Sequence, residues 1–253
     1  MNLNDQVRQF WEAEVCGTSA DLIGQFEPYS RAWYEAIEAH RYAAEPFIHA
    51  VAQFTRYRGL RVLEIGVGAG SDHLQWARAG ADCYGIDLTD AAIETTRQRL
   101  ALYGFSSQLQ RHDAETLPFA DGFFDIVYSW GVIHHSQRPE AIIAEIQRVL
   151  KAVGMFIGML YQRPSLVAWE LWVRHGLLRG KPLRSLHDIL WHHMESIGTK
   201  GYTVAELRSM FAAFKACQID PYLTEQDLRR FPKWLRAYVP RAWGIFLALR
   251  VVK

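Results

Sequence analysis

The stretch Val62-Leu-Glu-Ile-Gly-Val-Gly-Ala-Gly70 is a short apolar run that passes directly into three glycines. A short and nearly continuous apolar run is typical of a strand that is buried within a sheet. Gly66, Gly68 and Gly70 let the chain turn tightly and bring backbone amides against a ligand with no Cβ in the way. The stretch therefore predicts a buried strand, a ligand-binding turn and then a helix.

The spacing of these glycines narrows the class of ligand. A dinucleotide-binding turn would place its third glycine at the position of Ser71, whereas here it falls at Gly70. The acidic Glu64 lies two residues before the first glycine. This pattern favours a nucleoside-type cofactor without a pyrophosphate group. A glycine-rich turn alone is weak evidence, because it can simply connect a strand to a helix.

Short apolar runs alternate with helical periods from Leu60 to Gly158, which is the pattern of a parallel sheet with crossover helices. We expect strands at 60–65, 83–87, 108–110, 124–130, 155–160, 218–223 and 243–252. We expect helices at 73–79, 90–103, 139–150 and 203–214, with Gly154 ending the third of them. The sequence therefore predicts an α/β fold with a Rossmann-like, doubly wound and mostly parallel sheet.

Two flanking regions interrupt this alternation. Helical periods at 7–15, 31–40 and 46–57 predict an N-terminal helical cap over residues 1–58, with the main domain at 59–253. Residues 163–201 form a Trp- and His-rich insertion after the fifth strand, which we expect to be a helical lid. In the cap, Phe10 to Gly17 with Tyr29 and Tyr34 either close over the cofactor or belong to ordinary helix core. Both alternatives stay open at this point.

The insertion contains an amphipathic helical pattern, and Glu170 and Arg174 are expected to pair on its outer face. Its apolar positions are Leu166, Trp169, Trp172, Val173 and Leu177. Basic residues follow at Arg179, Lys181 and Arg184. Such a helix is compatible with a membrane surface or with an apolar acceptor, but we favour a cap helix that faces the core.

Composition excludes several classes of protein. The 253 residues include 28 Lys and Arg and 27 Asp and Glu, and a net charge of +1 is a poor footprint for a dedicated nucleic-acid binder. Three scattered cysteines provide neither a disulfide framework nor a zinc site with close-paired ligands. The start of the chain lacks a signal-peptide pattern, and no apolar run approaches the roughly 20 residues of a spanning helix. We therefore expect a cytoplasmic protein of one elaborated domain.

Five motifs follow one another in a recognisable order. They are Glu64-Ile-Gly-Val-Gly-Ala-Gly70, Gly85-Ile-Asp-Leu88, Asp113-Ala-Glu-Thr-Leu-Pro-Phe119, Phe124-Asp-Ile-Val-Tyr-Ser-Trp-Gly-Val-Ile-His-His135 and Arg148-Val-Leu-Lys-Ala-Val-Gly154. In type, order and spacing they resemble the class I S-adenosylmethionine-dependent methyltransferases, type 11 branch. The resemblance covers about Gly59 to Leu160 and implies a seven-stranded sheet whose last strand is antiparallel. It departs at Lys151-Ala-Val-Gly154, where the family usually has Lys-Pro-Gly-Gly.

The resemblance implies S-adenosylmethionine as the cofactor and S-adenosylhomocysteine as its product. The implied cofactor-binding residues are Glu64, Gly66, Gly68, Gly70, Asp87, Leu88, Asp113, Ala114, Glu115, Ser129, Trp130 and Gly131. In that family the glycine turn contacts the methionine and ribose portions, and the residue at Asp113 contacts the adenine amine. The residues at 129–131 flank the sulfonium. Asp87 corresponds to the residue that binds the ribose hydroxyls, since a carboxylate can accept from both hydroxyls of a diol.

His134 and His135 follow the fourth strand, where the acceptor of the methyl group should approach. Either could act catalytically by taking a proton from an acceptor hydroxyl or amine. The alternative, which we favour, is a fold feature that packs against the cofactor or a helix. His187, His192 and His193 lack carboxylate partners at ligand spacing, so we expect no required metal.

The leading hypothesis for function is methyl transfer to a small molecule at O, N or C by in-line displacement. The acceptor is open, and an apolar or lipid-like molecule and peripheral membrane contact are compatible with the insertion. RNA or protein methylation is an alternative that the near-neutral charge disfavours. A non-catalytic S-adenosylmethionine-binding protein is another. The sequence does not indicate the oligomeric state.

Overall fold

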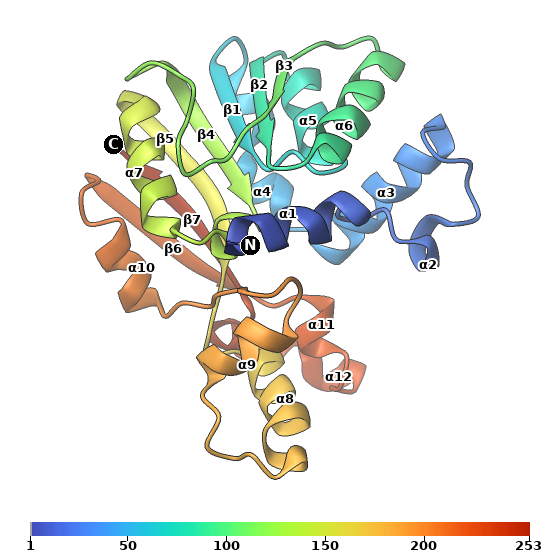
Figure 1. Ribbon diagram of the computed structural model, residues 1–253, viewed down its shortest axis with the longest axis vertical. Coiled ribbons are helices and arrows are strands. Elements are labelled where there is room, and N and C mark those ends of the chain that lie inside the picture. The colour runs from blue at the N-terminus through green and yellow to red at the C-terminus, as the bar shows by residue number, and fades with distance from the viewer. Residues whose placement is uncertain (1) are drawn as a thin grey trace.

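The computed structural model describes residues 2–253 and is built on one seven-stranded sheet with the strand order β3-β2-β1-β4-β5-β7-β6 (Figure 1). The strands are β1 (Arg61–Ile65), β2 (Asp82–Asp87), β3 (Gln108–Arg111), β4 (Phe124–Trp130), β5 (Leu150–Tyr161), β6 (Ala216–Tyr222) and β7 (Phe246–Val252). β1 to β5 pair in parallel, and β7 runs antiparallel to both β5 and β6. The expected fold class and the antiparallel last strand are confirmed.

Helices cover both faces of this sheet. The helices of the N-terminal half are α1 (Leu3–Ala13), α2 (Ala20–Ile23), α3 (Arg31–Ala44), α4 (Ile48–Ala52), α5 (Ser71–Arg78) and α6 (Asp90–Leu102). They are followed by α7 (Pro139–Val149) and α10 (Val204–Met210). Because side chains alternate along a strand, Val62 of β1 belongs to the apolar core that includes α4 and α5, and Leu63 belongs to the core that includes α7 and α10. Two apolar cores therefore sandwich the sheet.

The strand order places a crevice at the carboxyl end of the sheet. β1 leads to β2 and β3 on one side, and the chain then returns to add β4 on the other side of β1. In open α/β sheets, ligands bind outside the carboxyl ends of the strands where the order reverses in this way. The glycine turn follows β1 at this point, as the sequence predicts.

Several predicted boundaries are wrong. The third crossover helix, α7, ends at Val149, and Gly154 lies inside β5 instead of ending the helix. Leu150 pairs with Phe124 of β4, just before an irregularity in the β4–β5 pairing. β5 therefore begins at residues whose apolar spacing also fits a helix. The expected last strand begins at Phe246, after a 3₁₀ turn at Arg241–Trp243. The predicted helix at 46–57 breaks at Gln53, which has a φ of 51°.

A helical module projects from the sheet at the bottom of Figure 1. We use this name for residues 163–201, which follow β5, and 224–245, which connect β6 to β7. Its elements are α8 (Leu166–His175), η3 (Leu177–Arg179), α9 (Leu186–His193), α11 (Glu225–Leu228), α12 (Lys233–Arg236) and η4 (Arg241–Trp243). Among residues 2–253, no helix has the length and apolar character needed to cross a membrane.

Two expectations about α8 are wrong. Its buried side chains are Val167 and Ala168, whereas Trp169 and Val173 of the predicted core-facing stripe are exposed. Glu170 does not pair with Arg174 but binds two arginines that follow α11, Arg229 and Arg230. The helix is apolar on nearly every side, so its period does not identify the buried face.

Candidate active site

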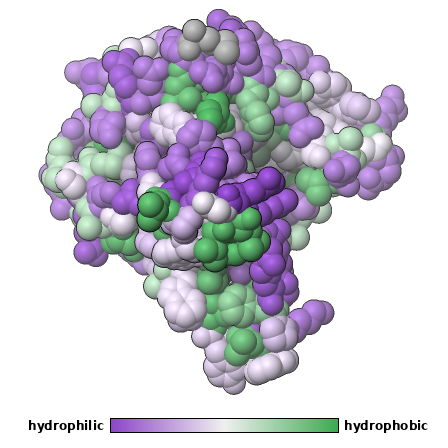
Figure 2. Space-filling model, turned by 60° about the horizontal axis from the view of Figure 1, so that its bottom comes forward, coloured by the Kyte–Doolittle hydropathy of each residue, from purple (hydrophilic) through white to green (hydrophobic). Residues whose placement is uncertain are grey.

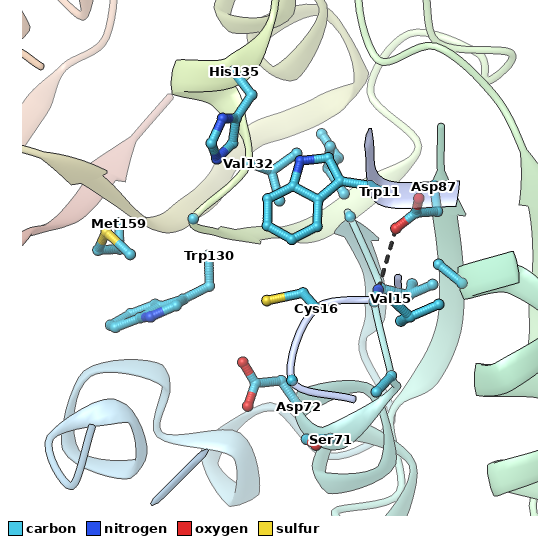
Figure 3. A pocket seen from close by; sticks show the side chains of 18 of the residues that line it. Trp11, Val15, Cys16, Ser71, Asp72, Asp87, Trp130, Val132, His135 and Met159 are labelled. Carbon is cyan, nitrogen blue, oxygen red and sulfur yellow. Dashed lines mark hydrogen bonds between the residues drawn. The ribbon is translucent and has the colours of Figure 1, made fainter. Parts of the chain in front are cut away.

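A cavity of about 480 Å³ opens over the carboxyl ends of β1, β2 and β4 (Figure 3). Its size is within the range of small-molecule and cofactor sites. Three parts of the chain enclose it: the glycine turn and strand ends, the N-terminal helices, and the base of the helical module. Representative lining residues from these parts are Gly68, Asp87, Trp11, Arg41, Glu195 and Thr224.

The glycine turn brings backbone to the cavity wall. Gly66 has a φ of 82°, and a Cβ there would lie 2.2 Å from Cγ2 of Val132, so the turn excludes a side chain. Gly68 has a φ of 52°, and no atom lies within 4 Å of where its Cβ would be. The backbone at Gly68 is therefore open to an occupant of the cavity, as the predicted role requires.

Asp87 ends β2 beside this turn. Its Oδ2 accepts from the backbone amide of Gly68 at 3.2 Å, and its Oδ1 accepts from the amide and hydroxyl of Thr89 at 3.0 and 2.8 Å. Burial raises the pKa of Asp87, and the hydrogen bonds from Thr89 and Gly68 oppose that rise. The carboxylate is thus held in one orientation at the cavity, which suits recognition of a diol.

Glu64 lies deeper, at the end of β1. It lines the cavity and makes a 2.9 Å hydrogen bond with Nδ1 of His73, whose Nε2 contacts the hydroxyl of Ser107 at 2.8 Å. Burial lowers the pKa of His73 to about 4, so the imidazole is neutral at pH 7. Burial and the nearby Asp72 raise the pKa of Glu64 well above its usual range. Glu64 and His73 therefore form a buried, hydrogen-bonded pair at the base of the site.

A buried network joins the first turn of α5 to the N-terminal helix α3. Asp72 accepts from the hydroxyls of Tyr128 and Tyr42 at 2.7 and 2.9 Å and from Nε of Arg41 at 3.0 Å. Burial alone would raise the pKa of Asp72, but the Arg41 guanidinium and these hydrogen bonds hold it below its usual range. Arg41 lines the cavity, but it belongs to no motif, and the helix predicted from the sequence stops at residue 40.

Another contact from α3 fixes an aromatic wall. Glu45 follows α3, and its carboxylate accepts a 2.5 Å hydrogen bond from Nε1 of Trp130 at the end of β4. Trp130 and the neighbouring Met159 face the cavity in Figure 3. The predicted residue Trp130 therefore stands at the wall, and its orientation depends on a carboxylate that no motif indicated.

The segment that leads from α1 closes part of the cavity. Trp11 lies edge-on to His135 with 5.7 Å between ring centroids, and Val15 and Cys16 also line the space (Figure 3). Tyr34, in contrast, is completely buried in the core, and Tyr29 is exposed. The sequence left open whether this region closes over the cofactor or belongs to the helix core. In the structure the Trp11–Cys16 stretch faces the cavity, whereas Tyr34 belongs to the core.

The two adjacent histidines differ in their surroundings. His135 lines the cavity; its Nδ1 lies 2.9 Å from the hydroxyl of Ser196 and 3.1 Å from that of Thr199. His134 is fully buried and stacks on Tyr161, with no hydrogen-bond partner for either ring nitrogen. Burial lowers the pKa of His134 well below its usual range, so this ring is neutral.

Glu195, from the helical module, completes the far end of the cavity. Its Oε2 lies 3.3 Å from Nε2 of His135, and its Oε1 accepts from the hydroxyl of Tyr161 at 2.9 Å. Among the described residues 2–253, His134, His135 and Glu195 are the one group whose potential metal-ligand atoms lie within 4.8 Å of one another. Glu195 was missed because it lies in an insertion outside every motif.

The structure places most of the implied cofactor residues at one cavity. Those that line it are Glu64, Gly66, Gly68, Asp87, Leu88, Asp113, Ala114, Trp130 and Gly131. Gly70, Glu115 and Ser129 lie outside its lining. Ser129 is buried and donates to the carbonyl of Ile65 at 3.1 Å. Their direct contact with a cofactor is not supported by this geometry.

Glu115 instead connects α1, near the N-terminus, to the segment that follows β4. It accepts from Nδ2 of Asn4 at 2.7 Å, from the hydroxyl of Ser136 at 2.7 Å and from Nε of Arg138 at 2.7 Å. Burial alone would raise the pKa of Glu115, but these hydrogen bonds lower it to about 2. Asn4 also donates to Asp113 at 2.9 Å, so α1 is tied to the strand ends below it.

Residues 63–158 match the model of a family described as a methyltransferase domain. These residues belong to that family. Membership implies S-adenosylmethionine as the cofactor, which agrees with the expectation from the motifs. The matched segment runs from β1 to β5 and contains the glycine turn, Asp87 and Trp130.

The chain is also similar to named relatives in sequence and to solved structures in fold. The chain is 35% identical over 144 residues to phthiotriol/phenolphthiotriol dimycocerosates methyltransferase 1 of Mycobacterium ulcerans, covering 54% of this chain and 49% of that one. It is 30% identical over 140 residues to a sterol 24-C-methyltransferase of Gibberella zeae, covering 51% and 37%. The chain thus spans about half or less of these relatives. An S-adenosylmethionine-dependent methyltransferase from Mesorhizobium loti has the same fold, with a TM-score of 0.61 at 16% identity, covering 82% of this chain and 97% of that one.

Proposed function

We propose that this methyltransferase transfers the methyl group of S-adenosylmethionine to a small apolar acceptor that carries a hydroxyl group. The observation that supports this most is the continuity of the cavity. Asp87 and the glycine turn line one part of it, and Trp130, His135 and Glu195 line another. Cofactor and acceptor would therefore share one enclosed space, as in-line displacement requires.

In this proposal the cofactor contacts are carried by the residues that line the cavity. Asp87 binds the ribose diol, the open backbone at Gly68 lies against the ribose and methionine portions, and Asp113 and Ala114 contact the adenine. Gly70 and Ser129 support the turn and the strand end from behind. The proposal therefore keeps nine of the twelve predicted cofactor-binding residues and gives Gly70, Glu115 and Ser129 supporting roles.

The acceptor end supports an apolar substrate. Trp11, Met159, Tyr161 and Phe246 are among its lining residues, and the surface of the cavity as a whole is mostly apolar. The sterol methyltransferase among the relatives acts on an apolar substrate by its name, which is compatible with this reading. The division into a cap at 1–58, a main domain at 59–253 and a lid at 163–201 stays part of the proposal.

When bound, S-adenosylmethionine would supply a methyl group on a sulfonium, and transfer would break the C–S bond and leave S-adenosylhomocysteine. The protein aligns the acceptor oxygen with that bond and excludes water, which can lower the barrier by roughly 7 to 11 kcal/mol in favourable cases. His135 takes the proton of the acceptor hydroxyl, and Glu195 beside it stabilises the imidazolium. Ser196 and Thr199 orient the ring. We propose no metal in this transfer.

Two measurements on the intact chain test the proposal. Calorimetric titration with S-adenosylhomocysteine should show saturable binding. Incubation with methyl-labelled S-adenosylmethionine and hydroxylated apolar compounds should move label into the organic phase. Label that moves only into tRNA or protein would replace the acceptor class. Tight binding without transfer to any acceptor would support a binding protein instead of an enzyme.

A further inference from the structure

We propose that the helical module binds an anionic lipid surface through the loop after α8 and the exposed aromatic side chains beside it. The proposed methyl transfer does not call for such a surface, and the two ideas fail independently. Three features of the module support it: exposed leucines at its tip, basic residues without acidic partners, and exposed aromatic residues on the neighbouring segment.

The tip presents apolar side chains to solvent. Every residue from Leu177 to Leu183 is exposed, and the exposed fractions of Leu177, Leu178 and Leu183 are 49%, 75% and 98%. A single exposed leucine needs no explanation, but three within seven residues at a projecting end do. In the view of Figure 2, apolar residues gather on the projecting part of the molecule at the bottom.

The exposed face of α8 continues this surface. Trp169 and Val173 are one helical turn apart on α8, and Leu177 begins η3 directly after Gly176, which caps that helix. Trp169 is 51% exposed and Val173 is 40% exposed, although the opposite side of α8 is buried. Of the five apolar positions that the sequence predicted to face the core, Trp169, Val173 and Leu177 are therefore exposed, whereas Leu166 and Trp172 are half-buried.

Basic residues accompany these apolar ones. Arg174, Arg179 and Lys181 are exposed, and within residues 2–253 none of them has an acidic side chain within ion-pair distance. The module contains eleven of the 28 Lys and Arg residues but only five of the 27 Asp and Glu residues, which leaves seventeen and twenty-two elsewhere. A nearly neutral chain thus has a basic module on an acidic body.

The segment between β6 and β7 adds aromatic residues. Trp234, Tyr238 and Trp243 are 73%, 77% and 49% exposed. The contacts of Arg229 and Arg230 with Glu170, the neighbour of Trp169, bring this segment beside α8. Tryptophan and tyrosine are favoured where one end of a side chain is apolar and the other is wet, as in the headgroup region of a bilayer.

The combination favours lipid over a protein partner. Apolar side chains interspersed with unpaired Lys and Arg are the pattern of interfacial membrane binding. Each basic residue near an anionic surface strengthens attachment by about fivefold, and added salt weakens it. Glu195 and Thr224 connect the module to the cavity wall, so an attached module would hold the cavity beside the bilayer. A lipid-like acceptor would then enter without crossing water.

Co-sedimentation of the full chain with vesicles tests this inference. We expect binding to vesicles of phosphatidylcholine and phosphatidylglycerol in equal parts, weak binding to phosphatidylcholine alone, and release by salt. Replacing Arg174, Arg179 and Lys181 together with alanine should lower the partition coefficient by about a hundredfold, since three such contributions multiply. The double variant Leu178→Asp and Leu183→Asp should lose binding as well.

Val153→Asp is the matched control, because Val153 is 82% exposed but lies at the start of β5, at the opposite end of that strand from α8. It should bind vesicles as the wild type does. All variants must keep the circular dichroism spectrum and the S-adenosylhomocysteine affinity of the wild type. Equal sedimentation of wild type and tip variants would overturn the inference. Loss of dimers in the Asp variants without any vesicle binding would assign the surface to a second copy of the chain.

Discussion

The backbone amide of Gly68 donates to the Asp87 carboxylate at 3.2 Å, which joins the turn after β1 to the end of β2. This hydrogen bond connects the glycine turn and the end of β2, which belong to two separate sequence motifs. It sets the carboxylate against the turn and leaves the second oxygen bound to Thr89. The geometry of the proposed cofactor site therefore depends on a contact between the two motifs as well as on each of them.

Asp87→Ala should lower the affinity for S-adenosylhomocysteine by about ten- to a thousandfold, because hydrogen bonds to a charged group contribute about 1.5 to 3 kcal/mol each. Calorimetric titration measures the change. Asp82→Ala is the control, since Asp82 begins the same strand, is half exposed and makes only a surface ion pair with Arg61. If the Asp87→Ala variant keeps the wild-type affinity, Asp87 does not bind the ribose hydroxyls.

Gly66→Ala should destabilise the fold more than Gly59→Ala does. Both glycines have a positive φ, 82° and 76°, so alanine is strained by roughly 1 to 2 kcal/mol at either position. Only at Gly66 would the new Cβ meet another side chain, 2.2 Å from Val132, whereas no atom lies within 4 Å at Gly59. Urea unfolding of the two variants compares the costs. Equal free energies of unfolding would show that the close approach to Val132 is unimportant.

Much of this architecture can be predicted from local patterns. The run from Phe124 to Trp130 is apolar because β4 is buried on both faces, and its length fits a strand. Asp87 is recognisable because it stands at the carboxyl end of a strand, where open α/β sheets bind ligands. The predictions succeed where one element's own period or end determines the outcome.

The missed features depend on contacts between distant segments. Arg41 and Asp72 form a hydrogen bond only because α3 packs over the first turn of α5. The apolar spacing within either helix does not indicate this contact. Glu195 reaches His135 from an insertion. Gly154 was misplaced because the apolar residues before it fit a helix and a strand equally well, and pairing with β4 decided between them. Tertiary packing overrides local preference at such positions.

Glu115→Gln should destabilise the protein at neutral pH and have a smaller effect in acid. The pKa of Glu115 is lowered to about 2, so its ionised form stabilises the fold above the usual carboxyl range and loses that contribution as the pH falls towards 2. Replacing the carboxylate should cost roughly 1 to 3 kcal/mol at pH 7. Urea unfolding of wild type and variant at pH 7 and near pH 3 measures the difference. A constant difference at both values would contradict a role for the charge.

His135→Gln should slow methyl transfer by about a hundredfold or more and flatten its pH dependence, because glutamine cannot take the acceptor proton. His134→Gln is the contrasting variant: its ring is buried away from the cavity lining, so the change should affect stability more than the pH profile. Affinity for S-adenosylhomocysteine, measured for both, separates loss of chemistry from loss of binding. Glu195→Gln should follow His135→Gln in direction with a smaller effect, since Glu195 acts through the imidazole at 3.3 Å. If His135→Gln keeps the wild-type pH profile and rate, alignment alone carries the reaction, and the pair of histidines is a packing feature of the fold.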